Sequence, residues 1–409
     1  MPLHLPWRLA LICGLGLSAP AFALTFEEAL TLADQQSPAL QTQQAGLDSA
    51  LAAEGAAASL PDPKLAVGVE NLLISGPDRF SLSNEPMTMR RIALMQEVPN
   101  QAKRAARTQG ALARSERERA MLTVARLQVR QALTRAWLAV QFVAQRQTVL
   151  DELVHENQRL QDTLGARIAG GSAQAADMLM ARQEALMLAD RHDDLLREDA
   201  KARAALRRLI GARADEALQG DAPLPTVQAE QTRAAVHQHA ELAVYTPMLD
   251  MAQAELREAQ AQTRGDWSWE FAYSRRGAQF GDMVSFQFTF DLPWQKERLQ
   301  LPLIKAKRFD VERIQAERDE SMRRHAQELD EQLAELRALD SQRARLQDAG
   351  LRLSRERVSL AMAAYQAGRS DLTAVLAARR DLLDTGMRGV DLDAQRADLR
   401  ARLNNLISE

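Results

Sequence analysis

The sequence predicts an α+β chain that consists mostly of long α-helices, with four β-strands, arranged as a tandem internal repeat. Three observations lead to this prediction. Two runs in which apolar and polar residues alternate lie next to each other between residues 266 and 293. Two stretches with heptad spacing, residues 101–164 and 305–366, are each long enough for one extended helix. The second half of the chain repeats short segments of the first half in the same order.

The segment at residues 266–293 contains two strands that each have one apolar and one polar face. Successive side chains of a strand point to opposite faces, so apolar residues at every second position line one face. Arg275, Arg276 and Gly277 follow the first run and favour a hairpin. The apolar positions, which we expect to face lipid, are Trp267, Trp269, Phe271, Tyr273, Val284, Phe286, Phe288 and Phe290. Strands of about nine to eleven residues with this pattern are typical of outer-membrane barrels. A hairpin that covers a soluble core is the alternative.

Charge and the N-terminal segment limit the class of protein. The formal charge of −3 and the pI near 6.2 give no reason to expect a nucleic-acid partner. Residues 1–23 are predicted to be a secretory signal peptide, with Arg8 before a short apolar run and the small residues Ala21 and Ala23 at the cleavage site. The only cysteine, Cys13, lies inside this segment, so the mature chain is expected to have no disulfide and no lipid anchor.

The first half opens with a predicted helix and continues with two strands. Thr25 and Glu28 have the spacing of a capping box, and Pro61 is expected to end the helix that they start. Residues 65–69 alternate as a strand, and residues 88–98 form a second, less regular one.

Two long helices are predicted to follow the strand pairs. At about 1.5 Å per residue, the helix over residues 101–164 would be on the order of 100 Å long, so we expect an elongated molecule. The apolar seam of the first helix contains Leu122, Val129, Leu133, Ala136, Val140, Val143, Leu150 and Val154. The seam of the second contains Leu339, Leu346, Leu353 and Leu360.

The repeat is visible as matched segments in the two halves. Residues 171–182 align with residues 368–379, and the segment that ends at Pro99 aligns with the one that ends at Pro293. Each half is therefore predicted to contain a helix, two strands, a long helix, a glycine turn and a further helix. The predicted parts of the mature chain are a first structural repeat at 24–210, an inter-repeat linker at 211–232 and a second structural repeat at 233–409.

These features together resemble the TolC family of outer-membrane efflux ducts. The resemblance covers essentially the whole mature chain and depends on the duplicated order of the opening helix, the strand pairs that end at Pro99 and Pro293, and the glycine turns. In that family three protomers each give four strands to one 12-stranded β-barrel in the outer membrane of a Gram-negative bacterium. Their helices form a long periplasmic α-barrel. The resemblance implies a homotrimer, and the strand count agrees, because four strands cannot close a barrel alone.

The resemblance also implies a function and partners. Residues 87–104 (MTMRRIALMQEVPNQAKR) and the short chain look most like the CzcC/CusC type of heavy-metal exporters. Such a duct exports heavy-metal cations passively, together with a periplasmic adaptor (membrane fusion) protein and an inner-membrane proton-driven pump of the RND type. A duct for drugs or for type I secretion is the alternative within the family. A secreted coiled-coil structural protein and a periplasmic adaptor are the alternatives outside it.

The sequence contains none of the motifs HExxH, CxxC, GxSxG or the P-loop. We therefore expect no enzymatic activity and no cofactor.

The resemblance places the periplasmic tip, where the duct narrows and the adaptor docks, at the two glycine turns. The residues that it assigns there are Gly170, Gly171, Asp177, Gly368, Arg369 and Asp371. A ring of carboxylates in a narrow trimeric pore would favour cations, whereas helix capping is the alternative role for both aspartates. Ala374 stands at the position equivalent to Asp177 in the second half, so a paired aspartate ring is not expected.

Two groups of possible metal ligands are interpreted as structural. His237 and His239 are two residues apart and would not share a helix face, so they are predicted to be solvated surface histidines. Met87, Met89 and Met95 could offer soft thioether ligands, but we interpret them as packing residues.

Three cations directly follow the junction at Pro99. Lys103, Arg104 and Arg107 would lie near the membrane surface if the strands are in lipid. They are expected either to meet phospholipid head groups or to form a solvated helix face.

Overall fold

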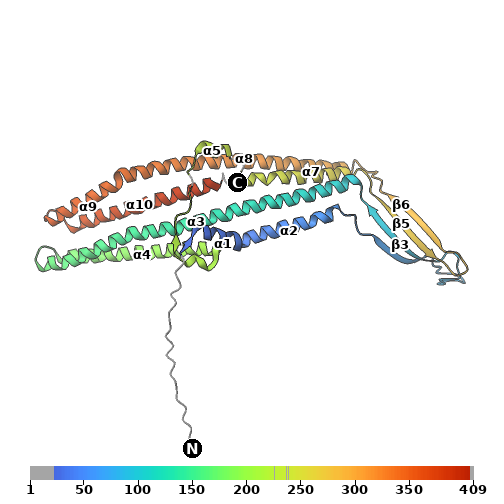
Figure 1. Ribbon diagram of the computed structural model, residues 1–409, viewed down its shortest axis with the longest axis horizontal. Helices are drawn as coiled ribbons and strands as arrows, with labels where there is room; N and C mark the ends of the chain where they lie inside the picture. The colour runs from blue at the N-terminus through green and yellow to red at the C-terminus, as the bar shows by residue number, and fades with distance from the viewer. Residues whose placement is uncertain (1–22, 225, 236, 238, 406–409) are drawn as a thin grey trace, which may run out of the picture.

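The computed structural model describes residues 23–224, 226–235, 237 and 239–405. The predicted signal peptide at residues 1–23 therefore lies almost entirely outside the described residues. Long helices run side by side along the molecule, a four-stranded sheet stands at one end, and two helical hairpins end at the opposite end (Figure 1). The molecule is elongated, as the two long heptad stretches predicted.

The two halves contain the same order of main elements. The first half contains β1 (Leu24–Thr25), α1 (Phe26–Gln36), α2 (Pro38–Ala58), β2 (Lys64–Glu70), β3 (Met89–Val98), α3 (Gln101–Ala169) and α4 (Ala175–Ile210). The second half contains α5 (Ala229–Ala235), α6 (Ala240–Ala243), α7 (Tyr245–Ala261), β5 (Trp267–Arg275), β6 (Met283–Phe290), α8 (Gln300–Arg345), α9 (Leu351–Gln366) and α10 (Leu372–Asn405). The exact residue boundaries of the repeats stay a prediction.

The predicted linker at residues 211–232 has structure of its own. It contains the short 3-10 helix η1 (Gly211–Asp215) and the strand β4 (Leu218–Gln219). β4 pairs in parallel with β1, and Leu24 lies opposite Leu218. The linker thereby ties the start of the described chain to the end of α4.

The four-stranded sheet joins the two halves of the chain. Its order is β2-β3-β5-β6, and each neighbouring pair is antiparallel. The central pair, β3 and β5, brings Val98 opposite Trp267 and Arg90 opposite Arg275. Among the described residues, β2 and β6 each have a neighbouring strand on one side only. The four predicted strands are confirmed, with small shifts of their bounds.

The opening helix begins as predicted but is interrupted. The Glu28 amide donates to the Thr25 hydroxyl at 3.3 Å, and the Thr25 amide donates to the Glu28 carboxylate at 3.1 Å, which is a complete capping box. The expectation of one helix up to Pro61 is wrong, because α1 and α2 are separate helices. Pro38 disfavours a helical conformation at Ser37, which is extended at φ −66° and ψ 117°.

The first long helix, α3, has 69 residues and spans roughly 100 Å. Most of the predicted seam of α3 is buried. Trp137, which lies beside the seam, is fully buried against α1, and the centroids of the Trp137 and Phe26 rings are 5.5 Å apart in an edge-to-face arrangement. The seam prediction is wrong for Val154, which is exposed, whereas Leu153 is buried. In a straight helix, residues with strict heptad spacing rotate around the helix axis by about 20° per heptad. After several heptads the seam position therefore faces away from the core, and a neighbouring residue faces inward.

The second long helix is divided and starts differently from the first. A π-helical turn, η3 (Leu346–Gly350), separates α8 from α9. Residues 294–299 lie between Pro293 and α8, whereas Asn100 alone lies between Pro99 and α3. The seam prediction is wrong for Leu353 and Leu360, since both are exposed and Leu360 has 72% of its surface accessible. No helix of the same chain covers this side of α9 within the described residues.

A cluster of polar contacts fixes the sheet to the helices at the start of α3. The Asn100 side chain caps α3 by accepting from the Lys103 backbone amide at 2.9 Å, and the Asn100 backbone amide donates to Asp266 at 2.9 Å. Lys103 Nζ lies 2.6 Å from the other oxygen of Asp266. Burial alone would raise the pKa of Asp266, but the hydrogen bonds from Lys103 and Asn100 outweigh it and lower the pKa below its usual value. We call these three residues the sheet–helix joint.

We predict that Asp266→Asn weakens the sheet–helix joint by about 1–3 kcal/mol at neutral pH, since it removes a charged hydrogen-bond acceptor from three donor groups of Asn100 and Lys103. A group with a lowered folded-state pKa stabilises above its unfolded pKa and loses this effect as the pH falls through the folded pKa. Hydrogen exchange of the first amides of α3 should therefore show a difference at pH 7 that shrinks in acid. Asp62→Asn, at an exposed position, is the matched control. Equal exchange in both variants at pH 7 would contradict this role.

Candidate functional site

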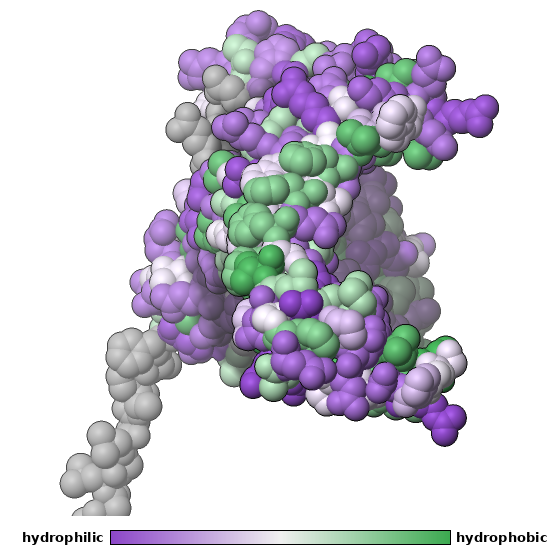
Figure 2. Space-filling model, turned by 90° about the vertical axis from the view of Figure 1, so that its right-hand side faces the viewer, coloured by the Kyte–Doolittle hydropathy of each residue, from purple (hydrophilic) through white to green (hydrophobic). Residues whose placement is uncertain are grey.

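One face of the sheet is mostly apolar across all four strands, with Arg90, Gln96 and Arg275 as its polar positions. Cross-strand neighbours place the predicted aromatic positions together, with Trp269 opposite Phe288 and Phe271 opposite Phe286. The Phe286 side chain has 61% of its surface exposed, and its ring lies 5.4 Å from that of Phe288. We call the following set the apolar sheet face: Leu65, Val67, Val69, Ile92, Leu94, Val98, Trp267, Trp269, Phe271, Tyr273, Val284, Phe286, Phe288 and Phe290. Figure 2 shows a green band of apolar surface at this end of the molecule, which no helix covers.

The opposite face of the sheet is polar. Arg91, on β3, binds Glu70 on β2 at 2.9 Å and also binds Glu270 on β5. On the same face, Lys64 lies 2.5 Å from Glu97. The sheet therefore has one mostly apolar and one mostly polar face, and no hydrophobic core cluster of the described residues includes its strands.

The methionines and the cations near the junction are dispersed rather than clustered. Met89 and Met95 lie six positions apart on the polar face of β3, roughly 20 Å along the strand, so they cannot share one ion. Lys103 and Arg107 are both paired within the chain, and contact of these cations with phospholipid head groups stays a prediction. Lys103 belongs to the sheet–helix joint, and Arg107 Nε lies 2.7 Å from Glu258 on α7.

The two glycine turns lie at the end of the molecule opposite the sheet and share one conformation. In the first turn the Gly171 amide donates to Ile168 and the Ser172 amide donates to Arg167. The second turn repeats this pattern at Gly368 and Arg369. Gly171 and Gly368 have φ values of +71° and +66°, which other residues rarely adopt, so glycine is needed at both positions. Gly170 is the C-cap of α3.

Asp177 is buried at the first turn of α4 and connects the two hairpins. Its carboxylate accepts from the backbone amide of Gln174 at 3.1 Å, as part of a capping box. The same oxygen, Oδ2, accepts from the Tyr365 hydroxyl of α9 at 2.9 Å. The guanidinium of Arg167 lies over the Tyr365 ring at 4.7 Å. Burial and the hydrogen bond to Asp177 together raise the pKa of Tyr365. We call the bond between Asp177 and Tyr365 the hairpin link.

The two other charged residues of the predicted tip, Arg369 and Asp371, are exposed. Asp371 is exposed directly before α10, and its carbonyl accepts from the Ala374 amide at 3.2 Å. Arg369 is exposed as well. Asp177 and Asp371 are therefore in different surroundings, although the repeat places both near the start of the returning helix.

A buried polar group lies behind the tips and was not predicted. Glu184 of α4 accepts a hydrogen bond from the Asn157 side chain of α3 at 2.6 Å, and burial raises the pKa of its carboxyl more than this bond lowers it. Arg379 of α10 is also buried. Each is a single polar residue within a helical seam, and nothing in the spacing of the sequence connects the three.

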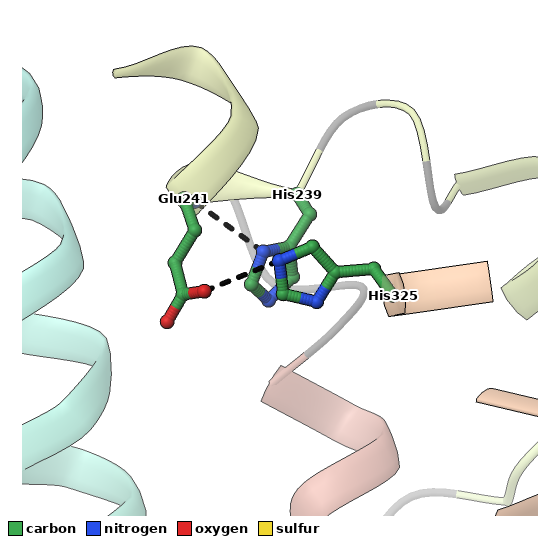
Figure 3. Close-up of side chains that lie close together, drawn as sticks. All are labelled: His239, Glu241 and His325. Carbon is green, nitrogen blue, oxygen red and sulfur yellow. Dashed lines mark hydrogen bonds and ion pairs between the residues drawn. The ribbon is translucent and has the colours of Figure 1, made fainter. Parts of the chain in front are cut away.

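Two histidines and a glutamate meet near the middle of the molecule. His239 and Glu241 come from the start of α6, and His325 comes from α8 (Figure 3). The ring centroids of the two histidines are 4.4 Å apart. Burial and the neighbouring His325 lower the pKa of His239, while Glu241 and Glu328 oppose this shift. The prediction of a solvated surface holds for His237, which is exposed, but is wrong for His239, because α6 turns it towards α8. His325 was not singled out in the sequence.

Comparisons with solved structures identify the fold. A membrane protein from Pseudomonas aeruginosa superimposes with a TM-score of 0.81 at 17% identity, over 94% of this chain and 90% of that one. The outer membrane protein VceC from Vibrio cholerae gives 0.79 at 17% identity, over 94% and 96%. CusC, whose structure was described in connection with transmembrane channel formation, gives 0.77 at 16% identity, over 94% and 92%. No protein-family model and no curated protein sequence matches this chain.

The chain thus has the fold of the TolC-type outer-membrane channels, and the predicted fold class is confirmed. The finer prediction of the heavy-metal type is not resolved, because CusC and VceC are about equally similar to this chain. Among the described helices, none is both long and apolar enough to cross a membrane.

We predict that Tyr365→Phe loosens the hairpin link. The substitution removes one hydroxyl from a buried carboxylate, and a hydrogen bond to a charged group is worth about 1.5–3 kcal/mol. Amides at the start of α4 and the end of α9 should exchange faster in the variant. Asp371→Asn, which changes an exposed carboxylate at the other turn, should leave the exchange unchanged. If Tyr365→Phe exchanged like the parent protein, the link would have no stabilising role.

Proposed function

We propose that this protein is an outer-membrane channel that serves as the exit duct of a tripartite efflux system, without a catalytic step. The observation that carries the proposal is the apolar sheet face, which projects beyond the helices and leaves most of its large apolar side chains exposed in the described part of the chain. A strand pattern with an apolar outer face and a polar inner face suits a barrel wall between lipid and a water-filled lumen. The shared fold with outer-membrane channels supports the same reading.

The channel is proposed to be a homotrimer. In lipid, an unpaired sheet edge leaves backbone N–H and C=O groups without partners, and each such group is costly. β2 and β6 present such edges in the described chain, so β6 of one copy would pair with β2 of the next until a barrel of twelve strands closes. Exposed apolar residues on the α8 and α9 side of the molecule, including Phe309, Leu353 and Leu360, would be covered by neighbouring copies.

The two hairpin tips are proposed to form the periplasmic aperture and the docking site for the adaptor. The hairpin link holds the second hairpin against the first, so separating them is a simple way to widen the tip. Asp177 is buried and bonded in this arrangement, which favours a role in capping and latching. Asp371 and Arg369 are exposed and available for a partner. An inner-membrane proton-driven pump of the RND type would supply the energy.

Heavy-metal cations are the proposed substrate, on the basis of the resemblance of residues 87–104 to the CzcC/CusC type. Export of drugs or other small molecules, or type I secretion, is the alternative. A secreted coiled-coil protein is disfavoured, because an exposed apolar face of this size on a soluble protein promotes aggregation. A periplasmic adaptor is disfavoured because this chain has two helical hairpins and one four-stranded sheet.

We predict that Phe286→Arg prevents insertion into the outer membrane, whereas Gln287→Arg is tolerated. The two residues are neighbours on β6 but lie on opposite faces of the sheet. A lipid-facing arginine near the bilayer midplane costs about 2–4 kcal/mol in each protomer, while one that faces the lumen stays hydrated. Membrane fractionation and the yield of trimer on a gel without boiling measure the outcome. Equal insertion of both variants would reject the assignment of the apolar sheet face to lipid.

The substrate class is tested in a deletion strain. Restoring the gene should restore growth on Co, Zn, Cd, Cu or Ag salts, and the Phe286→Arg variant should fail to do so. Growth of the same strains on a panel of lipophilic drugs is the comparison. Recovery on drugs but on none of the metals would support the alternative substrate class and leave the channel itself intact.

A further inference from the structure

We propose that His239, Glu241 and His325 bind one divalent transition-metal ion, which fastens α6 to α8. The inference is independent of what the channel exports, because the site lies away from both the sheet and the hairpin tips. The exposed His237 is not part of the site, because its spacing from His239 gives the two residues no common helix face.

The three side chains converge from two elements. One nitrogen from each histidine and one carboxylate oxygen of Glu241 lie within 4.8 Å of one another. Around a zinc ion with bonds of about 2.0–2.2 Å, tetrahedral ligand atoms stand roughly 3.4 Å apart. Closing the site therefore requires a small movement, and the Glu241 side chain is exposed enough to make it. The amide hydrogen bond that His239 Nδ1 now accepts is long, at 3.3 Å, and a metal bond at Nδ1 would replace it.

His325 points to a missing partner. Its side chain is 6% exposed, and neither ring nitrogen has a hydrogen-bond partner within the described part of the chain. His325 Nε2 lies 3.2 Å from the Glu241 carboxylate, within ion-pair distance (Figure 3). The geometry of this contact is not that of a hydrogen bond. A buried polar group without a hydrogen bond is destabilising, so such groups are rare and call for a specific cause. An ion between His325, His239 and Glu241 satisfies the nitrogen that faces them.

Glu328 completes the arrangement on the far side of the His325 ring. Its carboxylate lies 3.7 Å from Nδ1, one helical turn along α8. Histidine ligands commonly donate their second N–H to a carboxylate, which fixes the ring and makes the ligating nitrogen more basic. Glu328 is therefore assigned as a positioning residue rather than a ligand.

The donor set selects the class of metal. Two imidazoles and one carboxylate suit Zn²⁺, Co²⁺, Ni²⁺ or Cu²⁺, whereas Mg²⁺ and Ca²⁺ prefer sites built from oxygen alone. Three protein ligands leave at least one position for water, on the side where Glu241 is exposed. Because the ion would bridge α6, at the start of the second half, and the long helix α8, its role is to hold this part of the chain in place.

The test uses the mature protein, without a histidine tag, in detergent. We expect metal-depleted protein to bind Co²⁺ with a visible d–d spectrum at one ion per chain, to bind Zn²⁺ in competition, and to unfold at a higher temperature with Zn²⁺ present. Glu241→Gln and His239→Ala should weaken binding by on the order of a hundredfold or more, and Glu328→Gln by about 10–100-fold. Circular dichroism confirms that each variant is folded.

His237→Ala is the matched control, since it removes an exposed histidine two residues from His239. It should bind Co²⁺ like the parent protein. The proposal is overturned if the parent protein binds neither ion, if Glu241→Gln binds as tightly as the parent, or if His237→Ala loses binding to the same degree as His239→Ala. The last result would identify an adventitious surface site.

Discussion

The proposed channel depends on one constraint, that every backbone N–H and C=O of a strand in lipid needs a partner within the protein. The four-stranded sheet satisfies it for β3 and β5, which are paired on both sides, but not for the outer edges of β2 and β6. The apolar sheet face adds a second requirement, because it is stable only against lipid or another apolar surface. A closed ring of copies meets both requirements at once. In the proposed channel, the long helices continue the chain from the strands into the water on one side of the membrane.

The tandem repeat explains how one chain supplies four strands to the wall of the proposed barrel. Each half contributes one strand pair and one long helical hairpin, and the pairing of β3 with β5 joins them in the middle of the sheet. The sheet–helix joint is where the first half's α3 meets the second half, through Asn100, Lys103 and Asp266. The second half differs at the equivalent place, since residues 294–299 intervene before α8 and a π-helical turn divides the helix further on. The two halves of the chain have thus diverged in the long helix that follows each strand pair.

Local patterns in the sequence predicted most of the fold. Alternation identified all four strands, and glycine positions identified both turns, because only glycine adopts their backbone conformation readily. The break at Ser37 was not predicted, although Pro38 disfavours a helical conformation there.

The contacts within the candidate sites were not predictable in the same way. Tyr365 meets Asp177, and His325 meets His239, across long stretches of chain, and each is a single residue in an ordinary helical setting. No spacing rule connects residues that only the folded hairpins bring together. The prediction of the second helix's apolar seam was wrong near the tips for a related reason, because Leu353 and Leu360 face away from their own chain.

The strengths of the contacts indicate where the molecule can move. The sheet–helix joint combines an ion pair with several hydrogen bonds. The two hairpins are joined near their tips by the hairpin link, the contact of Arg167 with the Tyr365 ring, the ion pair of Glu156 with Arg379, and an apolar cluster that contains Leu164 and Leu372. Three hairpin links in a trimer, at about 1.5–3 kcal/mol each, amount to roughly 5–9 kcal/mol. A partner must prefer the open state by about 5.5 kcal/mol to move a two-state equilibrium from 1:99 to 99:1. The energy of the three hairpin links and the preference that a partner must supply are of the same order, so the proposed adaptor would be able to open the tips while the joint and the sheet keep their structure.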